Sequence, residues 1–158
     1  MKKIGVGIVA GAIGSVACSL VVGKISKGII NRQEKDIIRV KSYYNLLNRW
    51  LQIKQEGVSL VDYFHENEYK TIAVYGMGEL GRRLCEELKG TDIQVKYAID
   101  KNVNEIYSEV KLIGIEDFFE ETDVIVVSAV FAFEEIKENL RVKTDIPIVS
   151  LEDVVYGI

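Results

Sequence analysis

The sequence has 158 residues, 48% of them hydrophobic, and a formal net charge of −4. This length predicts one globular domain with appendages. The acidic balance argues against nucleic acid as the main partner. Two cysteines without metal-ligand or C-x-x-C spacing argue against a disulfide framework and a cysteine-based metal site.

The charge is divided unevenly along the chain. Residues 1–70 hold 11 Lys and Arg against 6 Asp and Glu, a net charge of +5, whereas residues 71–158 hold 9 against 18, a net charge of −9. A basic first part and an acidic second part predict that the two parts face different environments.

The segment from Ile4 to Gly23 contains no charged residue. A helix needs about 20 apolar residues to cross a bilayer core, so residues 1–24 are predicted to be a single transmembrane anchor. A cleaved signal peptide is the alternative, because Lys2 and Lys3 precede the apolar run, although no A-x-A cleavage site follows it. Both interpretations stay open. Small residues recur at every fourth position, as in helix pairs that approach closely: Gly7, Gly11, Ser15, Ser19 and Gly23.

The flanks of this segment predict its orientation. Basic residues are concentrated on its C-terminal side, from Lys24 to Lys54, where only Glu34 and Asp36 offset them. By the positive-inside rule the C-terminal domain is therefore expected in the cytoplasm, attached to the cell membrane by one span.

Residues 25–69 are expected to be a juxtamembrane helical segment. From Ser26 to Glu56 the chain has no proline and a single glycine. One apolar stripe has heptad-like spacing: Ile30, Ile37, Val40, Tyr44, Leu47 and Leu51. A second stripe runs beside it: Tyr43, Leu46, Trp50 and Ile53. The two stripes allow two interpretations, a helix packed on the following domain or a dimerisation helix.

Turn and cap residues mark the end of this segment. Gly57 is expected to cap the long helix at its C-terminus. Ser59 followed by Asp62 resembles a capping box that opens a short helix through about Glu66.

The stretch from Thr71 to Asp100 carries the strongest motif of the chain. An apolar run ends in Gly76-Met77-Gly78-Glu79-Leu80-Gly81, a G-x-G-x-x-G turn between an expected strand and an expected helix. A second apolar run ends in Asp100, at a spacing typical of nucleotide-binding βαβ units. In such units the first glycine makes the turn, the second lets a pyrophosphate approach, and the third lets the helix pack on the strand.

The remaining pattern alternates strands and helices. It predicts an α/β fold, a five-stranded parallel Rossmann-like sheet over residues 70–158. Strands are expected at 71–75, 94–99, 110–113, 124–128 and 148–150. Helices are expected at 79–89, 116–120 and 133–142, with a last short helix capped by Ser150 and Asp153.

Ligands of such sheets bind at the carboxyl ends of the strands. The expected nucleotide-binding residues are Gly76, Met77, Gly78, Glu79, Leu80, Gly81, Asp100, Lys101, Ser128 and Phe131. Asp100 suits the hydroxyls of an unphosphorylated ribose and so favours NAD over NADP, a preference that the adjacent Lys101 weakens. Ser128, Phe131 and Phe133 are expected to line a base or sugar pocket.

No catalytic set accompanies this motif. The single histidine, His65, has no base or orienting partner in the pattern, and no metal cluster, Walker loop or Ser-His-Asp set is present. Two Tyr-x-x-x-Lys matches, at Tyr97 and Tyr107, fall on a strand and in a loop and are attributed to chance. The chain is therefore expected to bind a nucleotide rather than to turn over a substrate alone.

Two stretches, TIAVYGMGELGRRLCEEL…VKYAID and DVIVVSAV…PIVSLEDV, resemble a bacterial family. They are similar to the Rossmann-like nucleotide-binding domain of polysaccharide-biosynthesis proteins. Examples are nucleoside-diphosphate-sugar epimerases or dehydratases and the N-terminal domain of sugar O-acyltransferases. The resemblance covers about residues 70–155. It implies NAD or nucleotide-sugar binding at Gly76, Gly78, Gly81 and Asp100, but the catalytic domain that follows in those proteins has no counterpart here.

These observations favour a membrane-anchored nucleotide-binding accessory domain in cell-surface polysaccharide assembly, expected to form a homodimer and to work with glycan-assembly enzymes. Two alternatives remain. One is a small NAD-dependent oxidoreductase or epimerase that a partner chain completes. The other is an NAD-sensing regulatory domain.

Overall fold

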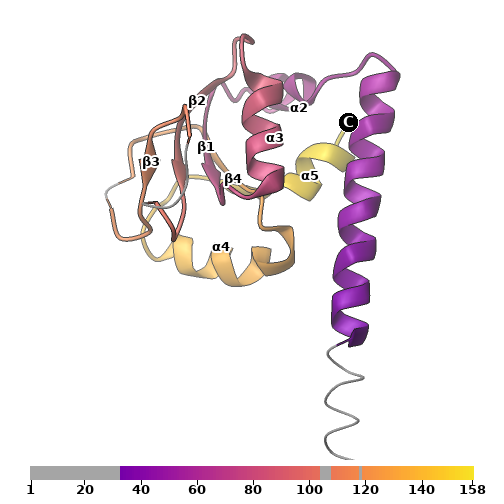
Figure 1. Cartoon of the computed structure of the whole chain (residues 1–158). Helices are drawn as coiled ribbons and strands as arrows, with labels where there is room; N and C mark the ends of the chain where they lie inside the picture. The colour runs from indigo at the N-terminus through magenta and orange to yellow at the C-terminus, as the bar shows by residue number, and fades with distance from the viewer. Residues whose placement is uncertain (1–32, 104–107, 118) are drawn as a thin grey trace, which may run out of the picture. The chain divides into compact units, whose positions relative to one another are not determined.

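The computed structural model describes residues 33–103, 108–117 and 119–158 (Figure 1). The chain divides into two compact units, residues 1–44 and 45–158. The transmembrane segment predicted at 4–23 lies outside the described residues. Within the described ranges, no helix is both long and apolar enough to cross a membrane.

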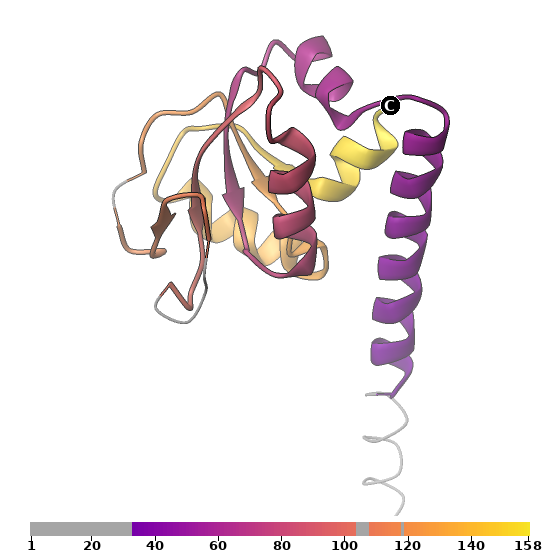
Figure 2. The same cartoon turned by 45° about the horizontal axis from the view of Figure 1, so that its top comes forward.

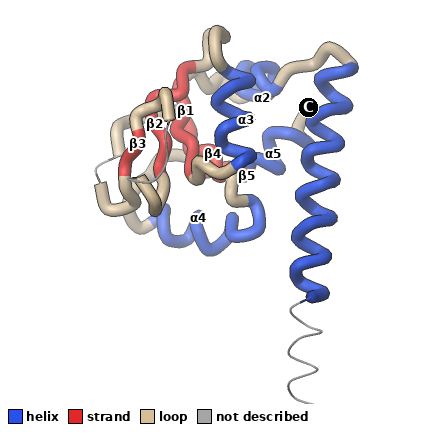
Figure 3. The backbone as a smooth tube through the Cα atoms, in the orientation of Figure 1, coloured by secondary structure: helices blue, strands red, loops and turns tan. Residues whose placement is uncertain are grey.

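The second unit is built on a five-stranded parallel sheet, coloured red in Figure 3. The strands are β1 (Thr71–Tyr75), β2 (Gln94–Ile99), β3 (Leu112–Ile113), β4 (Val124–Val127) and β5 (Ile148–Ser150). Their spatial order is β3-β2-β1-β4-β5, and every neighbouring pair is parallel. This arrangement confirms the predicted α/β Rossmann-like sheet. The strand order reverses between β1 and β4, which is where such sheets bind ligands.

Helices cover both faces of the sheet (Figures 1 and 2). They are α2 (Leu60–Glu66), α3 (Glu79–Leu88), α4 (Phe133–Arg141) and α5 (Leu151–Tyr156), with a 3-10 turn, η1, at Val130–Ala132. Helix α4 packs Ile136 and Leu140 on one face of the sheet, against residues such as Tyr75 and Val127. Helix α3 packs on β1 and β2 from the opposite side. Strand β4 is fully buried on both faces, as its continuous apolar run predicts.

The predicted helix caps are present. The Ser59 side chain accepts a hydrogen bond at the start of α2, and the Asp62 carboxylate accepts one from the Ser59 N–H at 3.1 Å. Ser150 and Asp153 form the same box at α5. At the end of the long helix, Gly57 has φ +78°, and the Val58 N–H donates to the Ile53 carbonyl at 3.0 Å. That bond marks a Schellman ending, which satisfies helix carbonyls that would otherwise lack donors.

Residues 33–55 form one helix, of which 45–55 belong to the second unit. Leu46, Trp50 and Ile53 are buried there. The Trp50 Nε1–H donates to the Glu87 carboxylate of α3 at 3.0 Å, and Lys54 pairs with the same carboxylate at 2.6 Å. Three residues of the second apolar stripe, Leu46, Trp50 and Ile53, therefore pack the 45–55 part of this helix on the Rossmann domain.

One predicted helix is wrong. Residues 115–117 form a turn instead of the start of an acidic helix at 116–120. The Asp117 carboxylate accepts a hydrogen bond from the Gly114 N–H at 2.6 Å, and the Asp117 N–H donates to the Gly114 carbonyl at 3.2 Å. Local bonds of this kind compete with helix formation. Strand β3 is also shorter than predicted, since it begins at Leu112 rather than at residue 110.

Asp123 joins the amino ends of β1 and β4. Its carboxylate accepts hydrogen bonds from the N–H groups of Lys70 and Thr71 at 2.8 and 2.7 Å, and from the Thr71 hydroxyl at 2.9 Å. These donors stabilise the ionised form, so they lower the pKa of Asp123.

We expect Asp123→Asn to lower the free energy of unfolding by about 1 kcal/mol at neutral pH. Because the folded-state pKa is lowered, the stabilisation is fully present above the unfolded-state pKa and is lost as the pH falls below about 4. Denaturant unfolding followed by fluorescence of the single tryptophan, Trp50, at pH 7 and pH 3 measures the difference. Asp145→Asn, at an exposed aspartate before β5, is the control. A deficit that is the same at both pH values would contradict this assignment.

Candidate nucleotide-binding site

The register of the sheet brings three strand ends to one level. Tyr75 of β1 pairs with Ile99 of β2 on one side and with Val127 of β4 on the other. The residues that follow these three, Gly76, Asp100 and Ser128, therefore meet at the carboxyl edge of the sheet. All three had been expected at this edge from the sequence.

Gly76 makes the turn that leaves β1. Its φ is +92°, a conformation that favours glycine, and a Cβ there would lie 3.0 Å from the Ser128 Oγ. The Ser128 hydroxyl donates to the Gly76 carbonyl at 2.6 Å. Ser128 thus connects the end of β4 to the glycine turn.

Gly81 allows α3 to lie against that turn. A Cβ at Gly81 would stand 2.0 Å from the Gly76 carbonyl oxygen, which is a backbone atom, and 3.1 Å from the Ser128 Oγ. No larger residue fits without moving the helix or the turn. This is the close approach of helix and strand that the third glycine of the motif permits.

Gly78 has a different role because the space beside it is open. A Cβ at Gly78 would meet no heavy atom within 4 Å, and its φ of −69° is ordinary. Gly78 is the N-cap residue of α3, and no side chain caps the helix there. The N–H groups at the start of α3 are therefore free of a side-chain cap, and such groups bind anions such as phosphates.

Asp100 is held beside the same turn by two backbone donors. The Met77 N–H donates to its Oδ2 at 2.7 Å, and the Asn102 N–H donates to its Oδ1 at 2.9 Å. An ionised carboxylate has about four acceptor sites, so each oxygen can take a further bond from a ribose hydroxyl. The Met77 contact fixes the carboxylate relative to the glycine turn.

The other residues of the turn contribute backbone rather than side chains. Met77 and Leu80 are each 4% exposed, and their side chains belong to the core. The exposed Glu79 carboxylate pairs with Arg83, one helical turn further on, at 3.0 Å. These three predicted binding residues can therefore reach a ligand chiefly through their main-chain atoms.

The last three predicted site residues lie in different environments. Lys101 is exposed beside Asp100. Phe131 lies on η1 and is 41% exposed. Ser128 is only 6% exposed, and its hydroxyl proton is used in the bond to Gly76. Ser128 was expected to line a pocket, but its visible role is to hold the turn.

A cavity of about 710 Å³ opens between the strand ends and α4. Its strand-side lining includes Tyr75, Gly76, Asp100, Lys101 and Asn102; its α4 lining includes Glu135, Ile136 and Asn139. The volume suits a small-molecule site. Burial raises the pKa of Tyr75, and the nearby Asp100 and Glu135 carboxylates raise it further. The Tyr75 hydroxyl therefore stays protonated at neutral pH.

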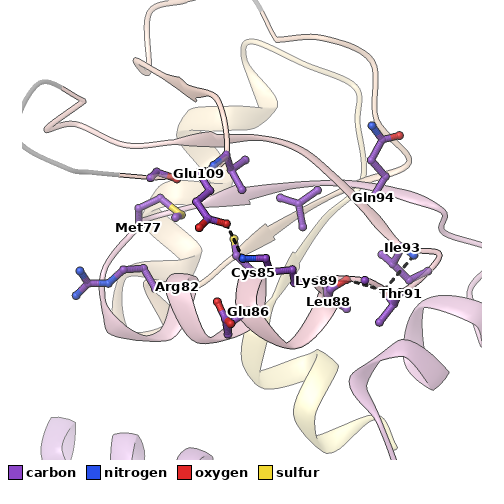
Figure 4. A pocket seen from close by; sticks show the side chains of 14 residues that line it. Met77, Arg82, Cys85, Glu86, Leu88, Lys89, Thr91, Ile93, Gln94 and Glu109 are labelled. Atoms are coloured by element: carbon purple, nitrogen blue, oxygen red, sulfur yellow. Dashed lines mark hydrogen bonds and ion pairs between the residues drawn. The ribbon is translucent and has the colours of Figure 1, made fainter.

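A second cavity, of about 450 Å³, lies along α3 and the start of β2 (Figure 4). Met77 and Arg82 stand at one end of it, and Thr91 and Ile93 at the other. Lys89 and Glu109 form an ion pair across it at 2.7 Å. Burial raises the pKa of the Cys85 thiol to about 11, so this lining cysteine is not a reactive thiolate at neutral pH.

Several residues that line the larger cavity were not predicted from the sequence. Asn102 stands two positions after Asp100, and this spacing is a signal for an Asx turn. Glu135 and Asn139 of α4 carried no such signal, because the helical pattern shows which face is apolar but not which residues reach the strand ends.

The remaining polar candidates lie away from the glycine turn. His65 of α2 pairs with Asp92 at 2.9 Å, and both residues precede strands, so they lie at the amino end of the sheet. This pairing lowers the pKa of Asp92. Tyr97 is fully buried and its hydroxyl donates to the Glu120 carbonyl at 2.8 Å, which supports the interpretation of its Tyr-x-x-x-Lys match as chance. Over the described ranges, no group of His, Cys, Asp and Glu could hold a metal ion.

A family model for the NAD binding domain of D-isomer specific 2-hydroxyacid dehydrogenases matches residues 40–137, more than half of the chain. The match spans the glycine turn, Asp100 and Ser128. Comparisons with curated proteins and with solved structures found no match. The predicted NAD-binding Rossmann domain is thereby confirmed, whereas the match is not to the polysaccharide-biosynthesis proteins that the sequence resembles.

Proposed function

Because the chain belongs to the family of NAD binding domains of D-isomer specific 2-hydroxyacid dehydrogenases, we propose that it binds NAD at the glycine turn and acts as an NAD-binding accessory domain. Three features that occur together at the start of α3 support this proposal most strongly. Gly78 faces open space, no side chain caps the helix, and Asp100 is fixed on the same turn by the Met77 N–H.

Each part of this site has a role toward NAD. The N–H groups that begin α3 would hold the pyrophosphate. Asp100 would accept hydrogen bonds from the hydroxyls of one ribose and would repel a phosphate on that ribose. The cavity beside α4 offers the Tyr75 hydroxyl and the Asn139 amide to the rest of the cofactor. When bound, NAD supplies a hydride acceptor in its nicotinamide ring.

Binding without turnover is the function that these residues support. The single histidine of the chain, His65, lies at the opposite end of the sheet, where it pairs with Asp92. The described linings of the two cavities contain no histidine. A proton-transferring group in contact with a substrate would thus have to come from elsewhere.

Calorimetric titration of the full chain with NAD, NADH, NADP and a uridine-diphosphate sugar tests the proposal. We expect saturable binding of NAD and NADH, with NADP weaker by about tenfold because Asp100 repels the added phosphate. Tight binding of the nucleotide sugar together with no response to NAD would instead favour a nucleotide-sugar site.

We expect Asp100→Asn to weaken NAD binding by about 10- to 100-fold, because hydrogen bonds to a charged acceptor contribute about 1.5–3 kcal/mol. The substitution keeps the size of the side chain but leaves one acceptor oxygen instead of two. Asp92→Asn makes the same chemical change at the amino end of the sheet and should leave the affinity unchanged. Equal affinities of the two variants would show that NAD does not contact Asp100.

The proposal includes the location of this domain in the cell and its partners. The uncharged residues 4–23 and the basic residues after them support a single membrane anchor with the NAD-binding domain in the cytoplasm. The resemblance to polysaccharide-biosynthesis proteins supports a place beside glycan-assembly enzymes. Fractionation of cells with and without residues 1–24 tests the anchor, since loss of that segment should move the protein from the membrane to the soluble fraction.

A second candidate is an oxidoreductase that a partner chain completes, which is compatible with the dehydrogenase family of the match to the same degree as an accessory domain. The full chain, incubated with NAD and a set of 2-hydroxy acids before and after the partner chain is added, distinguishes the two functions. The accessory-domain proposal expects no NADH formation. Turnover that disappears in Asp100→Asn would establish the oxidoreductase instead.

A further inference from the structure

The helix of residues 33–55 carries an apolar stripe in which four of five side chains are exposed and the fifth, Leu47, is half-buried. We call Ile37, Val40, Tyr44, Leu47 and Leu51 the heptad stripe, because they are spaced 3, 4, 3 and 4 residues apart. The exposed fractions of Ile37, Val40, Tyr44 and Leu51 are 66%, 70%, 66% and 55%. A sustained row of large exposed apolar side chains marks an interaction surface.

The heptad stripe is separate from the surface that packs on the Rossmann domain. At about 100° per residue, its centre lies roughly 130° around the helix from the centre of Leu46, Trp50 and Ile53. Those three residues are 1%, 5% and 1% exposed. The helix can therefore hold its own domain with one face and receive a second helix on the other.

The spacing of the heptad stripe specifies what covers it. With Ile37 and Tyr44 at a positions, Val40 and Leu47 fall at d positions, which is the seam of a coiled coil. Asp36 then occupies a g position and Lys41 the following e position. In a parallel two-stranded coiled coil, the g residue of one helix faces the e residue five positions later on the other. Asp36 of each copy would thus face Lys41 of the second copy.

We propose that two copies of this chain associate in parallel through the heptad stripes of residues 37–51, with reciprocal Asp36–Lys41 ion pairs beside the seam. An antiparallel pair would set g against g and e against e, which the Asp36–Lys41 pattern does not favour. This proposal does not depend on NAD binding.

Charge-reversal variants at Asp36 and Lys41 give the sharpest test. The strength of dimerisation is measured by sedimentation of the full chain in detergent micelles. Asp36→Lys alone and Lys41→Asp alone each place two like-charge pairs beside the seam. Each variant should therefore dimerise about tenfold more weakly than the unaltered chain, because attractive and repulsive pairs have similar magnitudes. A mixture of the two variants restores both opposite-charge pairs and should recover the dimer.

Cross-linking reports the seam independently of charge. The test uses a variant in which Cys18 and Cys85 are both replaced. In that variant, oxidation should link Val40→Cys into covalent dimers, because position 40 of one copy and position 40 of the other lie in the same d layer. Lys35→Cys, on the far side of the helix, is the matched control and should cross-link several-fold less. NAD titration of the same variants should give unchanged affinity.

Three outcomes would overturn the proposal. The first is a protein that stays monomeric at all concentrations. That outcome includes the case in which the heptad stripe lies on lipid instead of on a second copy. The second is a dimer that neither charge reversal weakens. The third is Val40→Cys cross-linking no better than the Lys35→Cys control.

Discussion

Gly78→Val is expected to weaken NAD binding at least 100-fold while leaving the protein folded. A Cβ added at Gly78 would have no protein atom within 4 Å, so the valine side chain enters the room that the pyrophosphate needs. The loss corresponds to two charge-assisted hydrogen bonds from the start of α3. The φ of −69° is open to valine, and the cost to stability is expected to stay below about 1 kcal/mol.

Calorimetric titration with NAD measures the first effect, and denaturant unfolding of the same preparation measures the second. Gly78→Ala should give a smaller loss of affinity, because its methyl group fills less of the space. If Gly78→Val binds NAD as well as the unaltered chain, the start of α3 does not hold the pyrophosphate.

Gly81→Ala is expected to have the largest effect on the fold. The added methyl group would stand 2.0 Å from the Gly76 carbonyl oxygen, and a backbone atom cannot rotate away as a flexible side chain can. Either α3 or the glycine turn has to move. Both belong to the packed core, where such overpacking costs about 3 kcal/mol or more.

Gly78→Ala provides the matched comparison, since it is the same substitution three positions away in the same motif. Unfolding of the two variants, followed by Trp50 fluorescence, should show a large loss for Gly81→Ala and a change below about 1 kcal/mol for Gly78→Ala. Equal stabilities would mean that the contact between Gly81 and Gly76 is not tight in solution.

Much of the fold was predictable because it depends on local patterns. Strands β1, β2 and β5 and the caps at Ser59 and Ser150 follow from apolar runs and side-chain chemistry within a few residues. The helix expected at 116–120 failed for a local reason as well, since the Asp117 carboxylate bonds the Gly114 N–H and forms a turn.

The glycine turn was predictable for a related reason. Each of its three glycines meets a local requirement of the backbone, namely the turn, the open space for a pyrophosphate or the close packing of the helix, and the spacing of the glycines is visible in the sequence. The function of Ser128 was not. Its hydrogen bond to the Gly76 carbonyl joins residues 52 positions apart, and only the register of β1 with β4 brings them together. The α4 lining of the cavity depends on the same long-range packing.

In the helix of residues 33–55, the burial of side chains distinguishes two apolar stripes that their spacing in the sequence does not. The two apolar stripes overlap in sequence, and spacing alone did not tell which one packs on the domain. The buried Leu46 and Ile53 and the exposed Ile37 and Val40 separate them. One stripe contacts the Rossmann domain, and the other is left for the proposed second copy.

A crystal structure of the full chain with NAD would show directly whether the cofactor lies at the glycine turn. We expect the pyrophosphate at the N–H groups that begin α3 beside Gly78, and one ribose within hydrogen-bonding distance of the Asp100 carboxylate. NAD found instead in the cavity between α3 and the start of β2, or no NAD at the carboxyl edge of the sheet, would rule out cofactor binding at the glycine turn.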